Sequence, residues 1–374
     1  MVDIHVGLIS GTSMDGIDAV VVDLATRPVR LLAARTVAFS PDIQTRLDGL
    51  RQDPDRFPLA ELGRLDALLG EALGAAARDV IDLAGVAVDD IKAIGSHGQT
   101  VLHRIEAALP HTLQIGDASR IAETTGIVTA SDFRRADVAA GGHGAPLAPL
   151  IHEALLADVN ERRVVVNLGG IANLTRLTPG APTIGFDTGP ANCFLDLWYR
   201  RFHQEERFDR DGLWASGGHV DAPWLGQLLE DPYFKLDAPK STGIEYFSAQ
   251  WLEARLPSWS EQRPQDIQAT LAEFSAAALT DAIQPMTPER ILLCGGGVQN
   301  LDLVERIKRR LPDCPIEPTD AHGLASDQVE AILFAWLSMQ RLAGRSVDTR
   351  SITGARQPVV LGTLCLPPCE NGSE

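Results

Sequence analysis

The first hundred residues alternate between short apolar runs and turns that contain glycine. Ile4, Val6 and Leu8 recur with a period of two, which predicts a β-strand. Apolar and β-branched residues over 17–24 and 29–39 predict two further strands. A polar turn separates the first strand from the second, so the chain is expected to open as strand, tight turn and strand.

A long helix and a fourth strand are predicted next. Apolar side chains between residues 59 and 83 recur at spacings of three and four, which is typical of a helix, and Gly85 is a suitable residue to end it. The apolar run 91–96 predicts a strand. The following segment, Gly95–Thr100, is polar and rich in glycine, so we expect an exposed loop at the carboxyl end of that strand.

The second half of the chain repeats the opening pattern. Residues 163–168 and 171–177 predict two strands joined by Gly169-Gly170, as a turn containing Gly11 joins the first pair. Two such hairpins indicate an internal duplication, in which each half is a sheet with helices packed on it, an α/β fold. The chain has no low-complexity linker, and the domain boundary is expected near residues 129–142.

A third glycine run follows a buried strand. Residues 290–294 predict this strand, which runs into Gly295-Gly296-Gly297, and helices are predicted over 265–284 and 301–311. Such an arrangement lets the backbone approach a ligand closely and directs helix N–H groups at it. Ser326 is expected to cap the last long helix.

Composition narrows the class of protein. The chain has 374 residues, of which 45% are hydrophobic and 22% charged, and this suits a soluble globular protein of two or three domains. It has no apolar run near the roughly 18 residues of a membrane span and no signal-peptide pattern, so a cytoplasmic protein is expected. A formal net charge of −17 disfavours nucleic acid and anionic membranes as partners. The five cysteines lack a zinc-site pattern and are expected to be reduced thiols.

The glycine turns prompt a search for a phosphate-binding motif, and the well-known motifs are absent. The sequence contains no Gly-x-x-x-x-Gly-Lys-Ser/Thr, no Gly-x-Gly-x-x-Gly after a predicted strand and no Gly-x-Ser-x-Gly. The turn Ser10–Asp18 instead combines backbone donors, hydroxyls and carboxylates. Its donors can grip phosphate oxygens while a carboxylate such as Asp15 holds Mg²⁺ through water. An ordinary hairpin turn is the alternative interpretation of this segment.

Several motifs, taken together, resemble a known family. They are Gly11–Asp18, Ser96–Thr100, Val166–Asn173, Phe186–Pro190, Pro239–Gly243, Cys294–Gly297 and Thr353–Ala355. These segments resemble the anhydro-N-acetylmuramic acid kinases, a family of the actin-like ATPase superfamily, over nearly the whole chain. The resemblance implies two actin-like, ribonuclease H-like lobes, residues 1–130 with 356–374 and residues 131–355, with Mg-ATP in the cleft between them.

The resemblance also implies roles for individual residues. The residues implied at the nucleotide are Gly11, Thr12, Ser13, Met14, Asp15, Gly16, Ile17, Asp18, Gly169, Gly170, Gly295, Gly296 and Gly297, with Asp15 at the metal. The residues implied at the sugar are His97, Gln99 and Arg120, and the implied catalytic residues are Asp187, as general base, and Glu330.

Each of these side chains also has an ordinary structural interpretation. On pattern alone Asp187, which follows a short predicted strand over 183–186, is a helix cap or a turn former. Glu330 suits the dipole of a helix in whose first turn it is expected. His97 can cap a loop, and Arg120 can be a solvated helix residue instead of a contact to the lactyl carboxylate of the sugar.

The implied activity is an unusual coupled reaction. Asp187 deprotonates a water that attacks the anomeric carbon of 1,6-anhydro-N-acetylmuramic acid, while the oxygen released at carbon six attacks the γ-phosphate of ATP. The product, N-acetylmuramate 6-phosphate, returns cell-wall sugar to metabolism in peptidoglycan recycling. The expected enzyme is a cytoplasmic homodimer that requires Mg²⁺.

Two departures from the family pattern keep alternatives open. The chain has Ala191 in Gly189-Pro190-Ala191-Asn192, where the family usually has Gly-Pro-Gly-Asn, and His143 where the family usually has Gln. Both departures put the fit around the substrate in doubt. A kinase of the same fold for another sugar is therefore one alternative, and a non-enzymatic, ATP-switched assembly protein is a second.

Overall fold

The computed structural model describes residues 2–11, 14, 16–203, 205–238, 240–256 and 263–368. The chain divides into two compact units, unit 1 with residues 1–155 and 328–374, and unit 2 with residues 156–327. The boundaries between the units follow residues 155 and 327, whereas the boundaries between the expected lobes follow residues 130 and 355. The physical reason is strand pairing and helix packing, because β7 (Thr129–Ser131) pairs with β4 (Ile91–Ser96), and α12 (Val329–Leu342) packs on β4.

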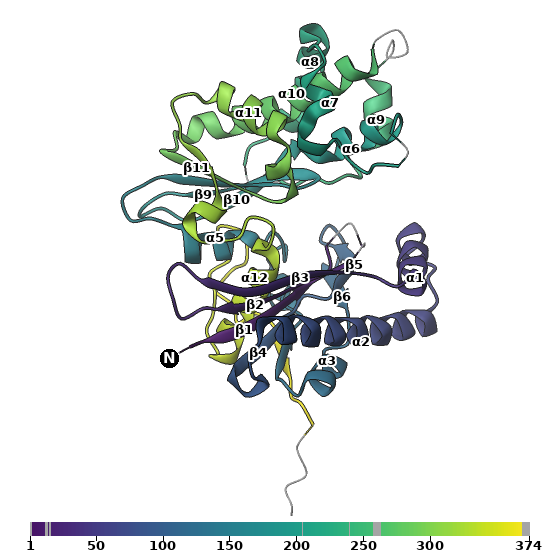
Figure 1. Cartoon of the computed structure of the whole chain (residues 1–374), viewed down its shortest axis with the longest axis vertical. Coiled ribbons are helices and arrows are strands. Elements are labelled where there is room, and N and C mark those ends of the chain that lie inside the picture. Colours follow the sequence, from purple (N-terminus) through teal and green to yellow (C-terminus); the bar gives the residue numbers. More distant parts are fainter. Residues whose placement is uncertain are drawn as a thin grey trace, which may run out of the picture. The chain divides into compact units, whose positions relative to one another are not determined.

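Unit 1 contains one large sheet, a hairpin and several helices (Figure 1). Its strands are β1 (Ile4–Ile9), β2 (Gly16–Asp23), β3 (Arg30–Ala38), β4, β5 (Gln99–Arg104), β6 (His111–Ile115), β7 and β13 (Thr363–Cys365). Its helices are α1 (Pro41–Gln52), α2 (Leu59–Ala84), α3 (Ala118–Thr125), α4 (Arg135–Ala139), α5 (Ala148–Leu156, whose last residue lies at the division) and α12, with the 3₁₀ turn η1 (Val88–Asp90).

The large sheet of unit 1 has the strand order β13-β7-β4-β1-β2-β3. The strands β1, β2 and β3 form an antiparallel meander, and β4 and β7 continue the sheet parallel to β1. β5 and β6 form a separate antiparallel hairpin.

Opposite faces of the unit 1 sheet carry different helices. Ile4, Val6 and Leu8 belong to an apolar cluster with the buried face of α2, as the alternation of side chains along a strand requires. The intervening residues face α12, because the Nδ1 atom of His5 lies 2.9 Å from the Ser338 hydroxyl. Figure 1 shows α2 running along the sheet.

Unit 2 repeats this strand topology with a larger helical part. Its strands are β8 (Arg163–Leu168), β9 (Ile171–Leu177), β10 (Ile184–Pro190), β11 (Arg290–Cys294) and β12 (Ile316–Pro318). Its helices are α6 (Asn192–Arg200), α7 (Leu213–Ser216), α8 (Ala222–Leu229), α9 (Ala249–Ala254), α10 (Pro264–Ile283) and α11 (Leu301–Arg310), with the 3₁₀ turns η2 (Arg210–Gly212), η3 (Pro232–Lys235), η5 (Gln284–Met286), η6 (Gly296–Gln299) and η7 (Thr319–His322).

The order β10-β9-β8-β11-β12 combines an antiparallel meander with two parallel strands, as in unit 1. The predicted α/β fold of two ribonuclease H-like units from an internal duplication is therefore confirmed. α10 lies in the core of unit 2, and its buried side chains pack with those of β8, β9 and α6.

Most predicted elements are present, and three local predictions are wrong. The segment Gly95–Thr100 is not an exposed loop, because β4 continues to Ser96, His97 and Gln99 are buried, and β5 begins at Gln99. Ser326 does not cap the last helix, which begins at Val329 after Gln328 without a side-chain cap. The strand expected to end before Asp187 continues to Pro190 with a register shift after Asp187.

Two further observations concern composition. In the described part of the chain no helix combines the length and apolar character needed to cross a membrane. Cys193, Cys294, Cys314 and Cys365 are free thiols, and Cys369 lies outside the described residues.

Candidate active site

A pocket of about 360 Å³ in unit 2 and a recess of about 280 Å³ in unit 1 are lined by seven of the fifteen predicted site residues that the structure describes. The residues lining the unit 1 recess are Ile9, Ser10, Gly11, His97, Gln99, Thr100, His103, Arg134, Ala145 and Glu330. Four residues predicted from distant motifs, Gly11, His97, Gln99 and Glu330, therefore come together at this recess.

Neighbouring strand ends bring these residues together. Because β1 and β4 are parallel, the residues that follow each strand meet at the same edge of the sheet. The amide of Ser10 donates to the carbonyl of Gly98 over 3.2 Å, and the Ser10 hydroxyl donates to Oε1 of Gln99 over 2.6 Å. The backbone and side chain of Ser10 thus hold the 97–99 segment in place.

His97 is a neutral, oriented side chain. Its Nδ1 lies 3.1 Å from the carbonyl oxygen of Gly98, which can only accept, so Nδ1 carries the proton. Its Nε2 accepts from Nε of Arg134 over 2.9 Å. Burial and then the charge of Arg134 lower the pKa of His97 well below its ordinary value, so this ring orients Arg134 and stays uncharged at neutral pH.

Arg134 brings a positive charge into the recess. Burial lowers its pKa to about 10, and Glu330 and Asp137 oppose this lowering, so Arg134 remains protonated at neutral pH. Its Nη1 donates to the carbonyl of Gly144 over 2.8 Å. Buried Asp137 holds the same loop by accepting from the amide of Gly144 over 2.7 Å, and its other oxygen accepts from the hydroxyl of Thr353 over 2.8 Å.

Glu330 stands in the first turn of α12, as predicted. Its side chain is exposed at the recess, yet the surrounding protein raises the pKa of its carboxyl group. The charge of Arg134 lowers that pKa and Asp18 raises it. The net direction is upward, so this carboxyl group holds its proton more tightly than an ordinary glutamate.

The predicted phosphate turn is only partly described. Thr12, Ser13 and Asp15, including the predicted metal ligand, lie outside the described residues. The amide of Met14 donates to the carbonyl of Gly11 over 3.1 Å.

The far end of this segment belongs to the sheet. Gly16 begins β2, Ile17 is buried in the core of unit 1, and Asp18 accepts a 2.6 Å hydrogen bond from Thr36. The structure does not bring Arg120 to the recess. Its guanidinium group pairs instead with Glu71 and Asp117 at 2.6 and 3.4 Å.

Asp187 of β10 lies in unit 2 and is held by the segment 240–242. Its Oδ2 accepts from the Ser241 hydroxyl over 2.8 Å and from the amide of Thr242 over 3.0 Å. Burial raises the pKa of Asp187, these two hydrogen bonds lower it, and Glu245 raises it, with a net upward direction. The arrangement presents an oriented carboxylate that is a stronger proton acceptor than an ordinary aspartate.

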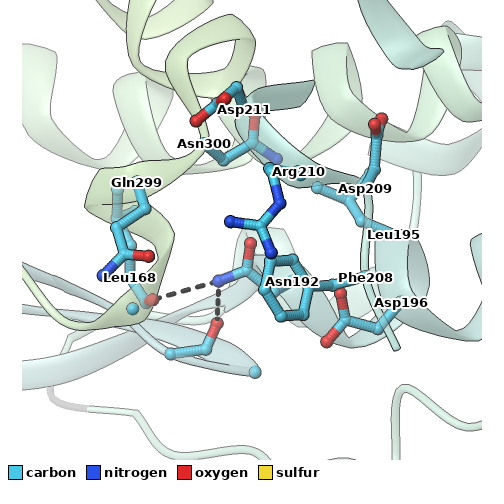
Figure 2. Close-up of a pocket in the computed structure, with 13 residues that line it drawn as sticks. Leu168, Asn192, Leu195, Asp196, Phe208, Asp209, Arg210, Asp211, Gln299 and Asn300 are labelled. Carbon is cyan, nitrogen blue, oxygen red and sulfur yellow. Dashed lines mark hydrogen bonds between the residues drawn. The ribbon is translucent and has the colours of Figure 1, made fainter. Parts of the chain in front are cut away.

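The unit 2 pocket contains most of the predicted nucleotide glycines of that unit. Its lining residues are Leu168, Gly169, Gly170, Asn192, Leu195, Asp196, Phe208, Asp209, Arg210, Asp211, Gly296, Gln299 and Asn300. Figure 2 shows Arg210 and Phe208 beside Asn192, whose Nδ2 donates to the carbonyls of Leu168 and Gly169 over 3.0 and 2.8 Å. The pocket therefore combines apolar walls with a guanidinium group and amides, as small-molecule sites generally do.

The glycines at this pocket serve two purposes. Gly295 has φ 82° and a Cβ there would collide with Asn167, so this residue permits the turn after β11. At Gly296 a Cβ would meet no atom within 4 Å, so its missing side chain leaves space at the pocket. The carbonyl of Gly170 accepts from the amides of Ala191 and Cys193, and in this way the turn also holds the start of α6.

The structure accommodates both departures from the family pattern. Ala191 is buried, and its amide donates to the carbonyl of Gly170 over 2.9 Å just before α6 begins. His143 has an exposed side chain and does not line the recess.

Sequence reasoning missed several lining residues. Arg134 and His103 belong to no glycine motif, and Phe208 and Arg210 come from an irregular segment around η2. Arg134 follows the short strand β7, and a cation at a strand end was the available signal. The residues 208–211 carry no sequence pattern that would place them at a pocket.

The comparisons with known proteins agree over nearly the whole chain. The family described as anhydro-N-acetylmuramic acid kinase matches residues 3–367. An anhydro-N-acetylmuramic acid kinase from Xanthomonas campestris pv. campestris is 49% identical over 367 residues, covering 96% of this chain and 97% of that protein. One from Xylella fastidiosa is 47% identical over 366 residues, covering 96% of each chain.

Solved structures with similar architecture are more distant. An activator of 2-hydroxyisocaproyl-CoA dehydratase from Clostridium difficile has a TM-score of 0.43 at 14% identity, covering 92% of this chain and 96% of that one. An ROK hexokinase from Thermus thermophilus has a TM-score of 0.37 at 18% identity, covering 91% and 99%.

Proposed function

The chain belongs to the anhydro-N-acetylmuramic acid kinase family, and we propose that its Asp187 is the general base that starts a coupled hydrolysis and phosphorylation. The protein is a kinase of anhydro-N-acetylmuramic acid that uses ATP. Family membership does not favour the two alternatives, a kinase of another sugar and an ATP-switched assembly protein.

The observation that carries the proposal is the way Asp187 is held. Ser241 and Thr242 both bond to Oδ2, and we assign Oδ1 to the attacking water. The bond from the anomeric carbon to oxygen six breaks as the water oxygen bonds to that carbon, and Asp187 takes the proton. Oxygen six then bonds to the γ-phosphorus as the bond to ADP breaks, and the products are N-acetylmuramate 6-phosphate and ADP.

The residues of the unit 1 recess suit an acidic amino sugar. Arg134 offers a protonated guanidinium group that can attract a carboxylate, and Gln99 and Glu330 can bond sugar hydroxyls. We assign Glu330 to proton exchange at the sugar because the surrounding protein raises its pKa. The contact of Arg120 with the sugar stays a prediction, because two carboxylates already pair with its guanidinium group.

We assign the nucleotide to the unit 2 pocket, where Gly169, Gly170 and Gly296 leave the backbone accessible. Arg210 supplies the positive charge that phosphates attract. The location of ATP between the two lobes stays a prediction. So does Mg²⁺, because the predicted ligand Asp15 lies outside the described residues, and within the described ranges no cluster of three or more His, Cys, Asp or Glu side chains suits a metal.

We further propose that this reaction belongs to peptidoglycan recycling in the cytoplasm, because the sugar is a cell-wall derivative and the donor is ATP. A homodimer is proposed on the resemblance alone. Sedimentation with and without ATP checks both the dimer and the assembly alternative, since filaments would pellet and a small dimer would not.

The proposal is tested with Asp187→Asn. The amide keeps the shape and can still accept from Ser241 and Thr242, but it cannot take the proton of the water. We expect sugar and ATP binding by calorimetry to persist while kcat falls by about 10³ to 10⁴, the upper range for a general base. The control Asp237→Asn changes an exposed carboxylate and should leave kcat unchanged. Turnover of Asp187→Asn within about tenfold of the unmodified protein would refute the assignment.

A further inference from the structure

The segment that holds Asp187 is itself anchored by a lysine. Lys240 directs its Nζ to the carbonyl oxygens of Tyr233 and Phe234, at 3.0 and 3.4 Å. Both carbonyls belong to η3, whose last residue is Lys235. The Tyr233 carbonyl also accepts from the amide of Leu236 over 3.2 Å, and a cation at the carboxyl end of a helical turn adds a second donor to carbonyls of this kind.

Tyr233 links the lysine to the proposed base a second time. Nζ of Lys240 lies 4.6 Å from the centre of the Tyr233 ring, within the range of a cation–π contact. The Tyr233 hydroxyl donates to the backbone carbonyl of Asp187 over 2.7 Å. The backbone carbonyl of Lys240 accepts from the amide of Asp187 over 3.0 Å. Each of the three residues Lys240, Tyr233 and Asp187 therefore contacts the other two.

Tyr233 is a rigid support for this set. Its side chain is buried, and its amide donates to Oδ1 of Asp231 over 2.9 Å. Asp231 is fixed in turn by Arg255 at 2.7 Å and by the indole of Trp251 at 2.9 Å. An anchor on Tyr233 consequently connects the segment 240–242 to the core of unit 2.

We propose that Lys240 is a positioning residue, which holds Ser241 and Thr242 against Oδ2 of Asp187 and thereby sets the orientation and acidity of the base. This inference rests on the proposed function of Asp187. We do not assign the charge of Lys240 to a phosphate, because its Nζ is directed at backbone carbonyls. Partial burial lowers the pKa of Lys240, which agrees with a structural use of this ammonium group.

The direction of the effect on Asp187 follows from its surroundings. Tyr233 and Glu245 are titratable groups that interact with Asp187, Lys240 contacts it through its backbone carbonyl, and the hydrogen bonds from Ser241 and Thr242 lower its pKa. If the anchor is lost, these two donors no longer stabilise the charged carboxylate, so the pKa of Asp187 rises. The carboxylate also loses the orientation in which it can accept the proton of the water.

The test combines a carboxyl ¹³C NMR titration of Asp187, assigned by the signal missing in Asp187→Asn, with kcat and KM. In Lys240→Met we expect the titration midpoint to rise by about one pH unit. We also expect kcat to fall at least about tenfold while both KM values change less than about twofold. Lys240→Arg should restore most of both readouts. The control Lys235→Met removes an exposed neighbouring lysine and should change neither.

A double-variant cycle separates the anchor from a simple charge effect. If Lys240 acts through Ser241, the midpoint shifts of Lys240→Met and Ser241→Ala are not additive in the double variant. Additive shifts, or an unchanged midpoint in Lys240→Met, would overturn the proposal. If Lys240→Met does not fold, Lys240→Gln takes its place in the same cycle. The titration needs no turnover, so its result is independent of whether Asp187→Asn confirms the base.

Discussion

Three carboxyl groups near the two sites share one physical property. The surrounding protein raises the pKa values of all three, Asp187, Asp196 and Glu330; for Asp187 and Asp196 the main cause is burial, which removes water that would stabilise the charged form, and at Glu330 the charge of Asp18 adds to the rise. Groups of this kind gather at functional sites, where a proton has to move near neutral pH. The cost is a loss of stability, since a charged carboxylate is less stable there than in the unfolded chain.

Asp196 at the unit 2 pocket makes this cost measurable. Burial raises its pKa from 3.8 to about 6, and Arg200 opposes the shift. Because the pKa is higher in the folded state, the folded state binds the proton more tightly, and this contribution to stability is lost as pH rises through about 6. Asp196→Asn should therefore raise the free energy of unfolding at pH 7 by about 1 to 3 kcal/mol.

Urea unfolding at several pH values checks this prediction. The difference between Asp196→Asn and the unmodified protein should shrink as pH falls from 7 toward 4, where the folded carboxyl group is already protonated. The exposed Asp237→Asn serves as the control and should show no such trend. A gain in stability that is independent of pH would contradict the explanation.

Gly296 provides a residue-scale test of the unit 2 pocket. A side chain at this position meets no protein atom within 4 Å of its Cβ, so Gly296→Val should fold, yet its branched side chain would occupy ligand space. We expect calorimetry to show ATP affinity reduced by about tenfold or more. Gly226→Val in α8 is the matched control, because its Cβ is equally unobstructed and lies outside the pocket.

Unchanged ATP affinity in Gly296→Val would exclude this pocket as the nucleotide site. Gly16, a glycine of the predicted phosphate turn, is a poorer test. A Cβ at Gly16 would approach the carbonyl oxygen of Val37 to 2.6 Å, so Gly16→Val would disturb the pairing of β2 with β3 whatever the ligand.

At the scale of elements, α12 lies unusually close to the unit 1 sheet. A Cβ at Gly7 of β1 would collide with the carbonyl oxygen of Ala331, and one at Gly95 of β4 would collide with that of Phe334. Two strand glycines thus let the helix backbone rest on the sheet, which fixes the position of Glu330 in its first turn.

Gly7→Ala and Gly95→Ala should each force α12 away from the sheet. We expect a loss of at least about 2 kcal/mol in the free energy of unfolding, together with reduced kcat, because Glu330 moves with the helix. Gly63→Ala in α2 is the control. Its Cβ meets no atom within 4 Å, and it should stabilise the protein by about 0.5 to 1 kcal/mol. Thermal and urea unfolding of the three variants checks this prediction. A free energy of unfolding for Gly7→Ala as high as that for Gly63→Ala would contradict the close approach of α12 to the sheet.

The sequence predicted elements best where one face of an element is apolar. α2 was predicted because its buried side chains recur at helical spacing, and it ends at Gly85, whose φ is 64°. The start of α12 was misplaced because residues 326 and 327 form a turn before the helix begins at Val329, which the position of Ser326 in the sequence does not reveal. The burial of His97 and Gln99 was also missed, because it results from contacts with Ser10 and Arg134 that no local pattern contains.

The same reasoning explains which site residues were predicted. His97, Gln99 and Glu330 were found through resemblance motifs, and the fold places them at one recess. Arg134 is an isolated residue, and only the parallel pairing of β4 with β7 brings it there. Asp187 was predicted as a residue, but the tyrosine and lysine that hold it became visible only in three dimensions.

On the scale of the whole molecule, two units with one strand topology carry different chemistry. Unit 1 holds the recess with Arg134 and Glu330, and unit 2 holds Asp187 and the glycine-lined pocket. The repeated sheet accounts for the two glycine turns, at Gly11 and Gly169, because each follows the first strand of its unit. The duplication therefore supplies a common framework on which different side chains are placed.

The central claim is that water attack on the anhydro bridge and phosphoryl transfer form one event. The most direct measurement compares ATP consumption by the purified protein with 1,6-anhydro-N-acetylmuramic acid and with reducing N-acetylmuramic acid, in ¹⁸O-labelled water. We predict rapid consumption with the anhydro sugar, label on the anomeric hydroxyl of the product and none in its phosphate, and barely any use of the reducing sugar. Faster consumption of the reducing sugar, or label in the phosphate of the product, would contradict the account.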